Sequence, residues 1–217
     1  MEALNPLRCV VAVVIILGAP VVSCPAFAGQ VHTYHVDFEL PIPAPDQAEA
    51  ELGRGWMADA VIDVTDHIFV SELDVSVSLT HDSLFDLQIL LKSPTGTNVV
   101  LNPAGNLAFI VRGQDGSLTR VGGSFQFLFD DEANVSIEDA TEPFIGPFGP
   151  VAPLSSLHGQ DAFGPWRLRI YDAFYADTGT LNSFELIVTT PEPTTAILLM
   201  LGTTLTMVCR PRRKSCL

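Results

Sequence analysis

Two apolar runs near the C-terminal end of the chain alternate with polar residues at every second position. In the first run Trp166, Leu168 and Ile170 fall on one face, and residues 181–188 repeat the pattern. A period of two is typical of a half-buried β-strand, because successive side chains of a strand point to opposite faces. The triplet Asp177-Thr178-Gly179 between the runs supplies turn residues, so we expect a hairpin. A hairpin is not stable alone in water, so the rest of the chain must supply a sheet.

The same alternation recurs along the middle of the chain between turn residues. Residues 93–97 (Ser-Pro-Thr-Gly-Thr) predict a hairpin turn, because Pro presets φ and Gly permits the reversal. Residues 114–123 and the Pro-rich residues 142–157 are expected to be surface loops without regular pairing, and residues 46–52 at most two turns of helix. Strands are predicted at Gln30–Leu40, Ala60–Val64, Phe69–Leu79, Leu87–Leu91, Val99–Leu101, Phe109–Val111 and around Phe125, Phe127 and Phe129. Many short strands indicate an all-β sandwich, a jelly roll of about eight strands.

The N-terminal residues 1–28 have the pattern of a secretory signal. Arg8 precedes an apolar run, and Ala26-Phe27-Ala28 forms a cleavage site after Ala28. An alternative is a bacterial lipobox that ends at Cys24, which would make that residue lipidated. Both interpretations predict export across the inner membrane.

The C-terminal residues 191–217 also read as a targeting signal. Pro191, Glu192 and Pro193 precede an apolar stretch at residues 194–208 and then a cluster of four basic residues. Fifteen helical residues span about 22 Å, which is short for a hydrocarbon core of about 30 Å. The stretch is therefore either a weak single-span anchor or a sorting tag whose tail is removed.

The order of these three parts resembles the PEP-CTERM sorting signal of Gram-negative bacteria. The resemblance implies processing by the membrane enzyme exosortase, with the tail in the membrane at least transiently. The product would reside in the cell envelope, at the outer surface or outside the cell.

The segment between the two signals, residues 29–190, has the length of a single domain and is strongly acidic. It holds 23 Asp or Glu and 6 Lys or Arg, a net charge of −17. This balance argues against nucleic-acid binding, which needs clustered basic residues, and suits solubility outside the cell. All four cysteines lie in the two end segments, which excludes a disulfide, a thiolate metal site and a Cys nucleophile from the domain.

The motif order over residues 41–188 resembles the P domain (P/Homo B), a β-sandwich that follows the catalytic domain of subtilisin-like proprotein convertases. The matching pieces are Leu79-Thr80-His81 with residues 86–91, the turn at 93–97, the acidic strand end at 129–133, and residues 164–168 with Asp172 and 177–181. Two positions depart from the family: Phe85 stands where Gly is frequent, and Phe184 where Trp is usual.

Acidic residues collect at the predicted strand ends. Calcium binds carboxylate and carbonyl oxygens, and loops that meet at one end of a sandwich can bring such ligands together. The resemblance to bacterial P domains that hold calcium also implies a calcium site there. The alternative is that Asp ends strands because it favours turns and keeps sheet edges soluble. The candidate ligands are Asp82, Asp86, Asp130, Asp131, Asp172 and Asp177.

Catalytic patterns find little support in the sequence. Asp177-Thr178-Gly179 matches the aspartic-protease triplet, but that chemistry needs two paired carboxylates and the chain has one copy. A serine-protease set needs Ser, His and Asp in a recognisable context, which is missing around His158-Gly159. His32 and His35 would point to opposite faces of a strand, so they do not predict a zinc site.

Other conspicuous side chains have structural explanations. Trp166 and Phe184 are expected in the core, and His81 is expected to pack at a strand end and bond a loop. Tyr171, Phe174 and Tyr175 are the candidates for an exposed aromatic platform that could bind sugar.

We therefore expect a non-catalytic binding or structural module of the bacterial envelope or extracellular matrix. Its partners would be exopolysaccharide or an envelope protein. The alternative is an accessory domain that supports a subtilisin-like protease in trans, as P domains do within one chain.

Overall fold

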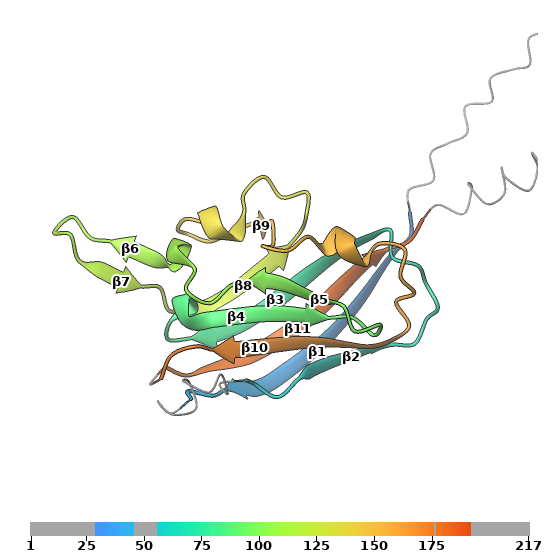
Figure 1. The fold of residues 1–217 in the computed structure, drawn as a ribbon, viewed down its shortest axis with the longest axis horizontal. Helices are drawn as coiled ribbons and strands as arrows, with labels where there is room; N and C mark the ends of the chain where they lie inside the picture. The colour runs from blue at the N-terminus through green and yellow to red at the C-terminus, as the bar shows by residue number, and fades with distance from the viewer. Residues whose placement is uncertain (1–28, 46–55, 176, 192–217) are drawn as a thin grey trace, which may run out of the picture.

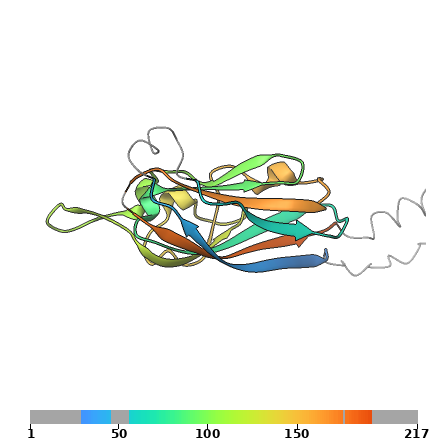
Figure 2. The same ribbon diagram turned by 90° about the horizontal axis from the view of Figure 1, so that it is seen from below.

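The chain folds into a β-sandwich of two sheets. The computed structural model describes residues 29–45, 56–175 and 177–191. The predicted signal peptide, the predicted helix at 46–52 and the predicted apolar tail lie outside these residues. Figures 1 and 2 show the two sheets stacked as layers, which confirms the predicted all-β sandwich.

The larger sheet has five strands and the smaller has four. In spatial order the larger contains β1 (Val31–Ile42), β11 (Gly179–Thr189), β3 (Glu72–His81), β8 (Gly123–Phe129) and β9 (Pro147–Phe148). The smaller contains β2 (Ala60–Val64), β10 (Gly164–Asp172), β4 (Leu87–Lys92) and β5 (Asn98–Asn102). The connections include the 3-10 turns η1 (Leu84–Asp86), η2 (Leu107–Phe109), η3 (Ile137–Asp139) and η4 (Leu154–Leu157).

The core lies between the two sheets and is built from the alternating residues that the sequence predicts. On β3 the predicted apolar residues Leu73, Val75, Val77 and Leu79 are all buried, and on β10 Trp166, Leu168 and Ile170 are fully buried. Because each strand alternates, the same strands turn polar residues outward. Burial of these inward faces holds the two layers together.

The predicted hairpin of β10 and β11 is wrong. The two strands lie in different sheets: β10 pairs with β2 and β4, whereas β11 pairs with β1 and β3. The loop with Asp177 and Thr178 therefore crosses from one layer to the other. A period of two specifies which face of a strand is buried, but it says nothing about which strands lie beside it.

Two segments expected to be irregular contain paired strands. Residues 118–120 form β7, which pairs with β6 (Ile110–Arg112) in a two-stranded ribbon that projects from the sandwich in Figure 1. In the Pro-rich segment, β9 pairs in parallel with β8 at Leu128 and Phe129. The predicted hairpin of β4 and β5 is confirmed, and Ser93 N–H donates to the Thr97 carbonyl at 2.9 Å across its turn.

The N-terminal and C-terminal ends of the sandwich lie side by side at the same edge. Val31 of β1 is paired with Thr189 of β11, and Thr190 N–H donates to the Gln30 carbonyl at 2.8 Å.

In the described part of the chain, no helix is long and apolar enough to cross a membrane.

Candidate functional site

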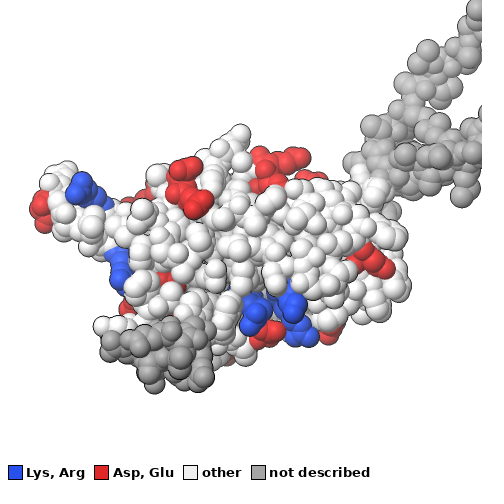
Figure 3. Space-filling view, viewed as in Figure 1, with Lys and Arg blue, Asp and Glu red and all other residues white. Residues whose placement is uncertain are grey.

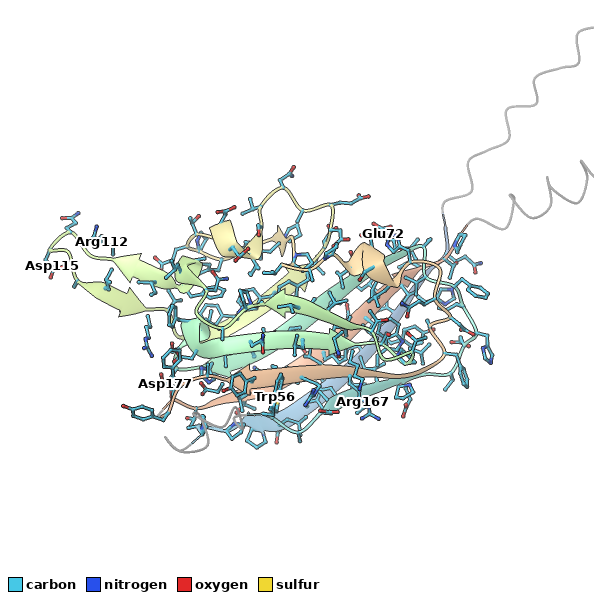
Figure 4. The ribbon with its side chains drawn as sticks, viewed as in Figure 1. Trp56, Glu72, Arg112, Asp115, Arg167 and Asp177 are labelled. Atoms are coloured by element: carbon cyan, nitrogen blue, oxygen red, sulfur yellow. The ribbon has the colours of Figure 1, made fainter. Side chains whose placement is uncertain are left out.

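The six predicted calcium ligands do not converge at one end of the sandwich. Asp82, Asp86, Asp172 and Asp177 lie where β3 and β10 end. Asp130 and Asp131 follow β8, which is antiparallel to β3, so they lie at the opposite end. In Figure 4 the labelled Asp177 marks one end of the sandwich, and the labelled Glu72, a neighbour of Asp130 and Asp131, lies toward the other end. The expectation that strand-end loops gather all six carboxylates is wrong, because antiparallel strands end at opposite edges.

At the first end, a half-exposed arginine holds two of the predicted carboxylates. Arg120 Nη1 lies 3.1 Å from Asp86 Oδ2 and 3.6 Å from Asp177 Oδ2. The guanidinium also lies over the rings of Phe85 and Phe174, at 5.3 and 5.0 Å from their centroids. Burial and the neighbouring Asp177 carboxylate raise the pKa of Asp86, and the Arg120 charge acts against this shift. Arg120 thus supplies the positive charge that a metal would otherwise provide here.

The same end of the sandwich contains a buried His–Asp pair. His81 Nε2 is 3.4 Å from Asp172 Oδ2, and both side chains are completely shielded from solvent. His81 Nδ1 lies 2.8 Å from the Ser83 carbonyl oxygen, and Asp172 Oδ1 accepts from Phe174 N–H at 3.0 Å. These bonds fix the two connections that cross between the sheets. The prediction that His81 packs at a strand end and bonds a loop is confirmed.

At the second end, Asp130 and Asp131 belong to a larger acidic group with Glu72, Asp74 and Glu132. Both predicted residues bond backbone: Asp130 Oδ1 accepts from Glu132 N–H at 2.6 Å, and Asp131 accepts from the N–H groups of Leu154 and Ser155 at 2.8 and 2.7 Å. Asp74 Oδ1 is buried, and within the described chain no hydrogen-bond donor reaches it. Burial, followed by the surrounding carboxylates, raises the pKa of Asp74 to about 6.

This raised pKa predicts an unusual effect of removing a charge. The folded state binds the Asp74 proton more tightly than the unfolded chain does, so ionisation destabilises the fold as the pH rises from about 4 to above 6. Asp74→Asn is therefore expected to raise the free energy of unfolding at pH 7.5 by about 1 kcal/mol, a value reduced for solvent screening. At pH 4 the variant and the parent should have equal stability.

Urea denaturation at the two pH values measures this effect. Asp115→Asn on the exposed ribbon is the matched control, because hydrogen bonds from Ser117 lower the pKa of Asp115 instead. A destabilised Asp74→Asn variant at pH 7.5 would contradict the prediction.

The described residues contain no group of three or more Asp, Glu, His or Cys with the geometry of a metal site. The six predicted ligands do not fit one calcium ion, because they lie at two ends and several of their oxygens already bond Arg120 or backbone N–H groups. Calcium binding stays a prediction from the resemblance, and calorimetric titration with CaCl₂ tests it: no heat at millimolar calcium would contradict it.

The outer face of the five-stranded sheet carries a groove of about 700 Å³. Its floor includes polar side chains such as Ser76, Gln126 and Glu185, and its wall is the loop from Pro143 to Pro147. At the tip of this loop, Ile145 is 82% exposed. The groove therefore offers a partner an apolar wall and a floor of mixed polar and apolar side chains.

The outer face of the four-stranded sheet carries a second distinctive surface, which we call the basic–aromatic face. It contains three of the five basic residues in the described part of this acidic chain. Figure 3 shows basic side chains gathered on this face, and Figure 4 shows Trp56 and Arg167 along it. The face consists of Trp56, Lys92, Arg167, Arg169 and Tyr171, which come from β4, β10 and the segment before β2.

Contacts within the face fix its side chains. Arg169 lies over the Trp56 ring at 4.3 Å from the centroid, and its Nε is 3.0 Å from Asp59 Oδ1. Trp56 and Tyr171 are 5.1 Å apart between ring centroids and are joined by an isolated β-bridge. These contacts hold Trp56, Arg169 and Tyr171 in place relative to one another.

The predicted aromatic platform is divided by the fold. Tyr171 belongs to the basic–aromatic face, whereas Phe174 packs against Phe85 and Arg120, and Tyr175 is 58% exposed on the same crossing loop. The sequence offered no signal for Trp56 or Lys92, because only the strand register brings them beside Tyr171 and Arg167. The predictions that Trp166 and Phe184 are core residues are confirmed.

A comparison with models of known protein families matched one segment of the chain. Residues 70–117 match the family model of the proprotein convertase P-domain, a segment that includes β3, β4 and β5. The chain thus carries a P-domain-like β-sandwich. A comparison with curated proteins gave no match.

Two solved structures resemble the fold. The serine protease of Aeromonas sobria in complex with its chaperone has 16% sequence identity and a TM-score of 0.46, and the similarity covers 76% of this chain and 28% of that one. A second structure of the serine protease of Aeromonas sobria has 16% identity and a TM-score of 0.41, with 75% and 27% covered. This chain therefore spans little more than a quarter of these proteins.

Proposed function

We propose that the chain is an exported, non-catalytic binding module of the bacterial envelope or extracellular matrix. The observation that supports this proposal is the basic–aromatic face, a concentrated and ordered cationic surface on a domain with a net charge of −17. Isolated charges on such a domain are expected to be surrounded by acids, which would neutralise them. A cluster of three bases beside two aromatic rings in contact, one of them under an arginine, is typical of a surface that holds a partner.

Capture from the producing cell tests this function. The full chain, immobilised and incubated with envelope extract and culture medium, is expected to retain a macromolecule. The double variant Lys92→Gln/Arg167→Gln should lose it, because two of the three positive charges are gone. Arg112→Gln, on the projecting ribbon, removes a charge far from the face and should bind as the parent does. Equal capture by all three proteins would contradict the proposal.

Export and sorting belong to the same proposal. The protein isolated from the envelope or medium is expected to begin at Gly29 and to end near Thr190, after cleavage behind Ala28 and removal of the tail by exosortase. Its intact mass measures both events. A mass that includes residues 191–217 would mean that the tail is retained as an anchor, and a lipid on Cys24 would support the alternative start.

A second candidate is an accessory role for a subtilisin-like protease in trans. The match of residues 70–117 to the P-domain family model favours it, and the groove with Ile145 at its rim offers a contact surface. Enrichment of a subtilase in the capture experiment, lost in Ile145→Asp and retained in Lys92→Gln/Arg167→Gln, would support this role over the first.

A further inference from the structure

Two positive charges lie directly opposite each other on the basic–aromatic face, an arrangement that an anionic ligand would stabilise. Arg167 and Lys92 are direct partners in the register of β10 and β4, and both side chains point outward. Like charges placed directly opposite on neighbouring strands destabilise a sheet. Asp59 compensates in part, since its carboxylate lies 3.5 Å from Arg167 Nη1 and 3.0 Å from Arg169 Nε. Within the face and its ion pairs, three bases and one acid leave an excess of two positive charges, while exposed Asp63 of β2 points outward on the same sheet beside them.

The arginines present groups that suit a carboxylate. Arg169 uses Nε for Asp59, and its guanidinium plane rests on Trp56. The two terminal nitrogens of a guanidinium form a planar fork that binds a carboxylate through two parallel hydrogen bonds. The Arg167 and Arg169 side chains are 38% and 34% exposed, so they can reach a ligand from a supported position.

The aromatic residues present an apolar surface beside these charges. Trp56 and Tyr171 are half-buried, with ring centroids 5.1 Å apart and planes inclined by 37°. Aromatic side chains with one apolar and one polar region suit ligands that have both. A pyranose ring has an apolar C–H face and a rim of hydroxyl groups, so it can rest on such rings while its substituents reach the charges.

The layout of the charges favours a polymer over a single sugar. Neighbouring strands lie about 5 Å apart, and alternate residues of one strand about 7 Å apart, so the cations repeat in both directions across an open sheet. A linear chain with one carboxylate on each unit can satisfy several cations at once, and linked contacts strengthen one another.

From these features we propose that the basic–aromatic face binds an anionic polysaccharide whose sugar units carry carboxylates. The inference rests on the proposed binding function and names its ligand class. Lys92, Arg167 and Arg169 hold the carboxylates, and Trp56 and Tyr171 support the sugar rings. The acidic remainder of the domain repels the polymer elsewhere, which restricts binding to this face.

Affinity electrophoresis of the full chain in gels that contain polygalacturonate tests the inference, with dextran as the uncharged control polymer. Polygalacturonate is expected to retard the parent, dextran is not, and added NaCl should weaken the retardation through screening. Lys92→Gln/Arg167→Gln should weaken binding at least tenfold. Trp56→Leu should weaken it at unchanged charge, and Arg112→Gln should leave it unchanged. Circular dichroism confirms that each variant is folded.

The outcomes separate this inference from the function on which it rests. Equal retardation by dextran, equal binding of single-stranded DNA, or a double variant that binds polygalacturonate as the parent does would overturn the ligand class. If polygalacturonate fails but capture from the envelope extract still depends on Lys92 and Arg167, the binding function stands and the polysaccharide inference falls. If capture is also independent of these residues, both fall.

Discussion

Trp166→Ala is expected to lower the free energy of unfolding by about 4 kcal/mol, which is within the range for truncation of a large buried aromatic side chain. Trp166 is completely buried between the two sheets, and its indole N–H donates to the Ala162 carbonyl oxygen at 2.8 Å. The substitution removes the apolar surface, leaves a cavity and strands a buried acceptor. Urea denaturation followed by circular dichroism measures the loss.

A milder substitution at this position keeps the prediction testable if Trp166→Ala does not fold. Trp166→Phe keeps an aromatic ring in the core but removes the N–H donor, so it should cost about 2 kcal/mol. A loss below about 1 kcal/mol for Trp166→Ala would mean that the core does not depend on this side chain.

Gly179→Ala is expected to destabilise the protein by about 3 kcal/mol, at the upper end of the cost of overpacking. A Cβ at this position would overlap the ring of His81 and the carbonyl oxygen of Thr80. Neither can move easily, because His81 is buried against Asp172 and Thr80 is paired with Thr180 across the sheet. Thermal unfolding monitored by circular dichroism should show a large decrease in Tm.

Asp177→Asn is the matched control within the same triplet. Asp177 lies 3.6 Å from Arg120 and is part-exposed, so its substitution should cost less than about 1 kcal/mol. The glycine of Asp177-Thr178-Gly179 would then matter because the backbone of β11 approaches β3 closely. A larger loss from Asp177→Asn than from Gly179→Ala would contradict this explanation.

The sequence predicts which face of each strand is buried far better than it predicts which strands pair with one another. The residues expected inside β3 and β10 are buried, since period-two alternation records burial directly. The pairing of β10 and β11 was predicted wrongly because a turn triplet such as Asp177-Thr178-Gly179 can also cross between sheets. Only the competition among all strands for partners decides which occurs.

The same limit applies to the candidate site. Arg167 and Arg169 alternate with core residues, so the sequence places them on one outer face. Lys92 is more than seventy positions away, and only the register of β4 against β10 sets it opposite Arg167. Of the acidic group near the start of β3, the sequence singled out Asp130 and Asp131 as candidate ligands but not Asp74, because Asp74 lies within a strand pattern and carries no turn signal.

The structure shows what Phe85 does at a position where the sequence departs from the P-domain pattern. Where the family frequently has Gly, the Phe85 ring packs at 5.8 Å from Phe174 and beneath the Arg120 guanidinium. This end of the sandwich is therefore covered by side chains drawn from three separate connections. At the same end, the His81 and Asp172 side chains are completely buried.

The position of β11 has a consequence for the order in which the protein can fold. β11 is the last strand among the residues that the structure describes, yet it lies between β1 and β3, so β1 pairs with a strand almost 150 residues later. The five-stranded sheet cannot close until residues 179–189 have emerged from the machinery that makes or exports the chain. Such long-range pairing slows folding. A chain that is exported while residues 179–189 are still being made would therefore cross the membrane without this sheet and complete it only on the far side.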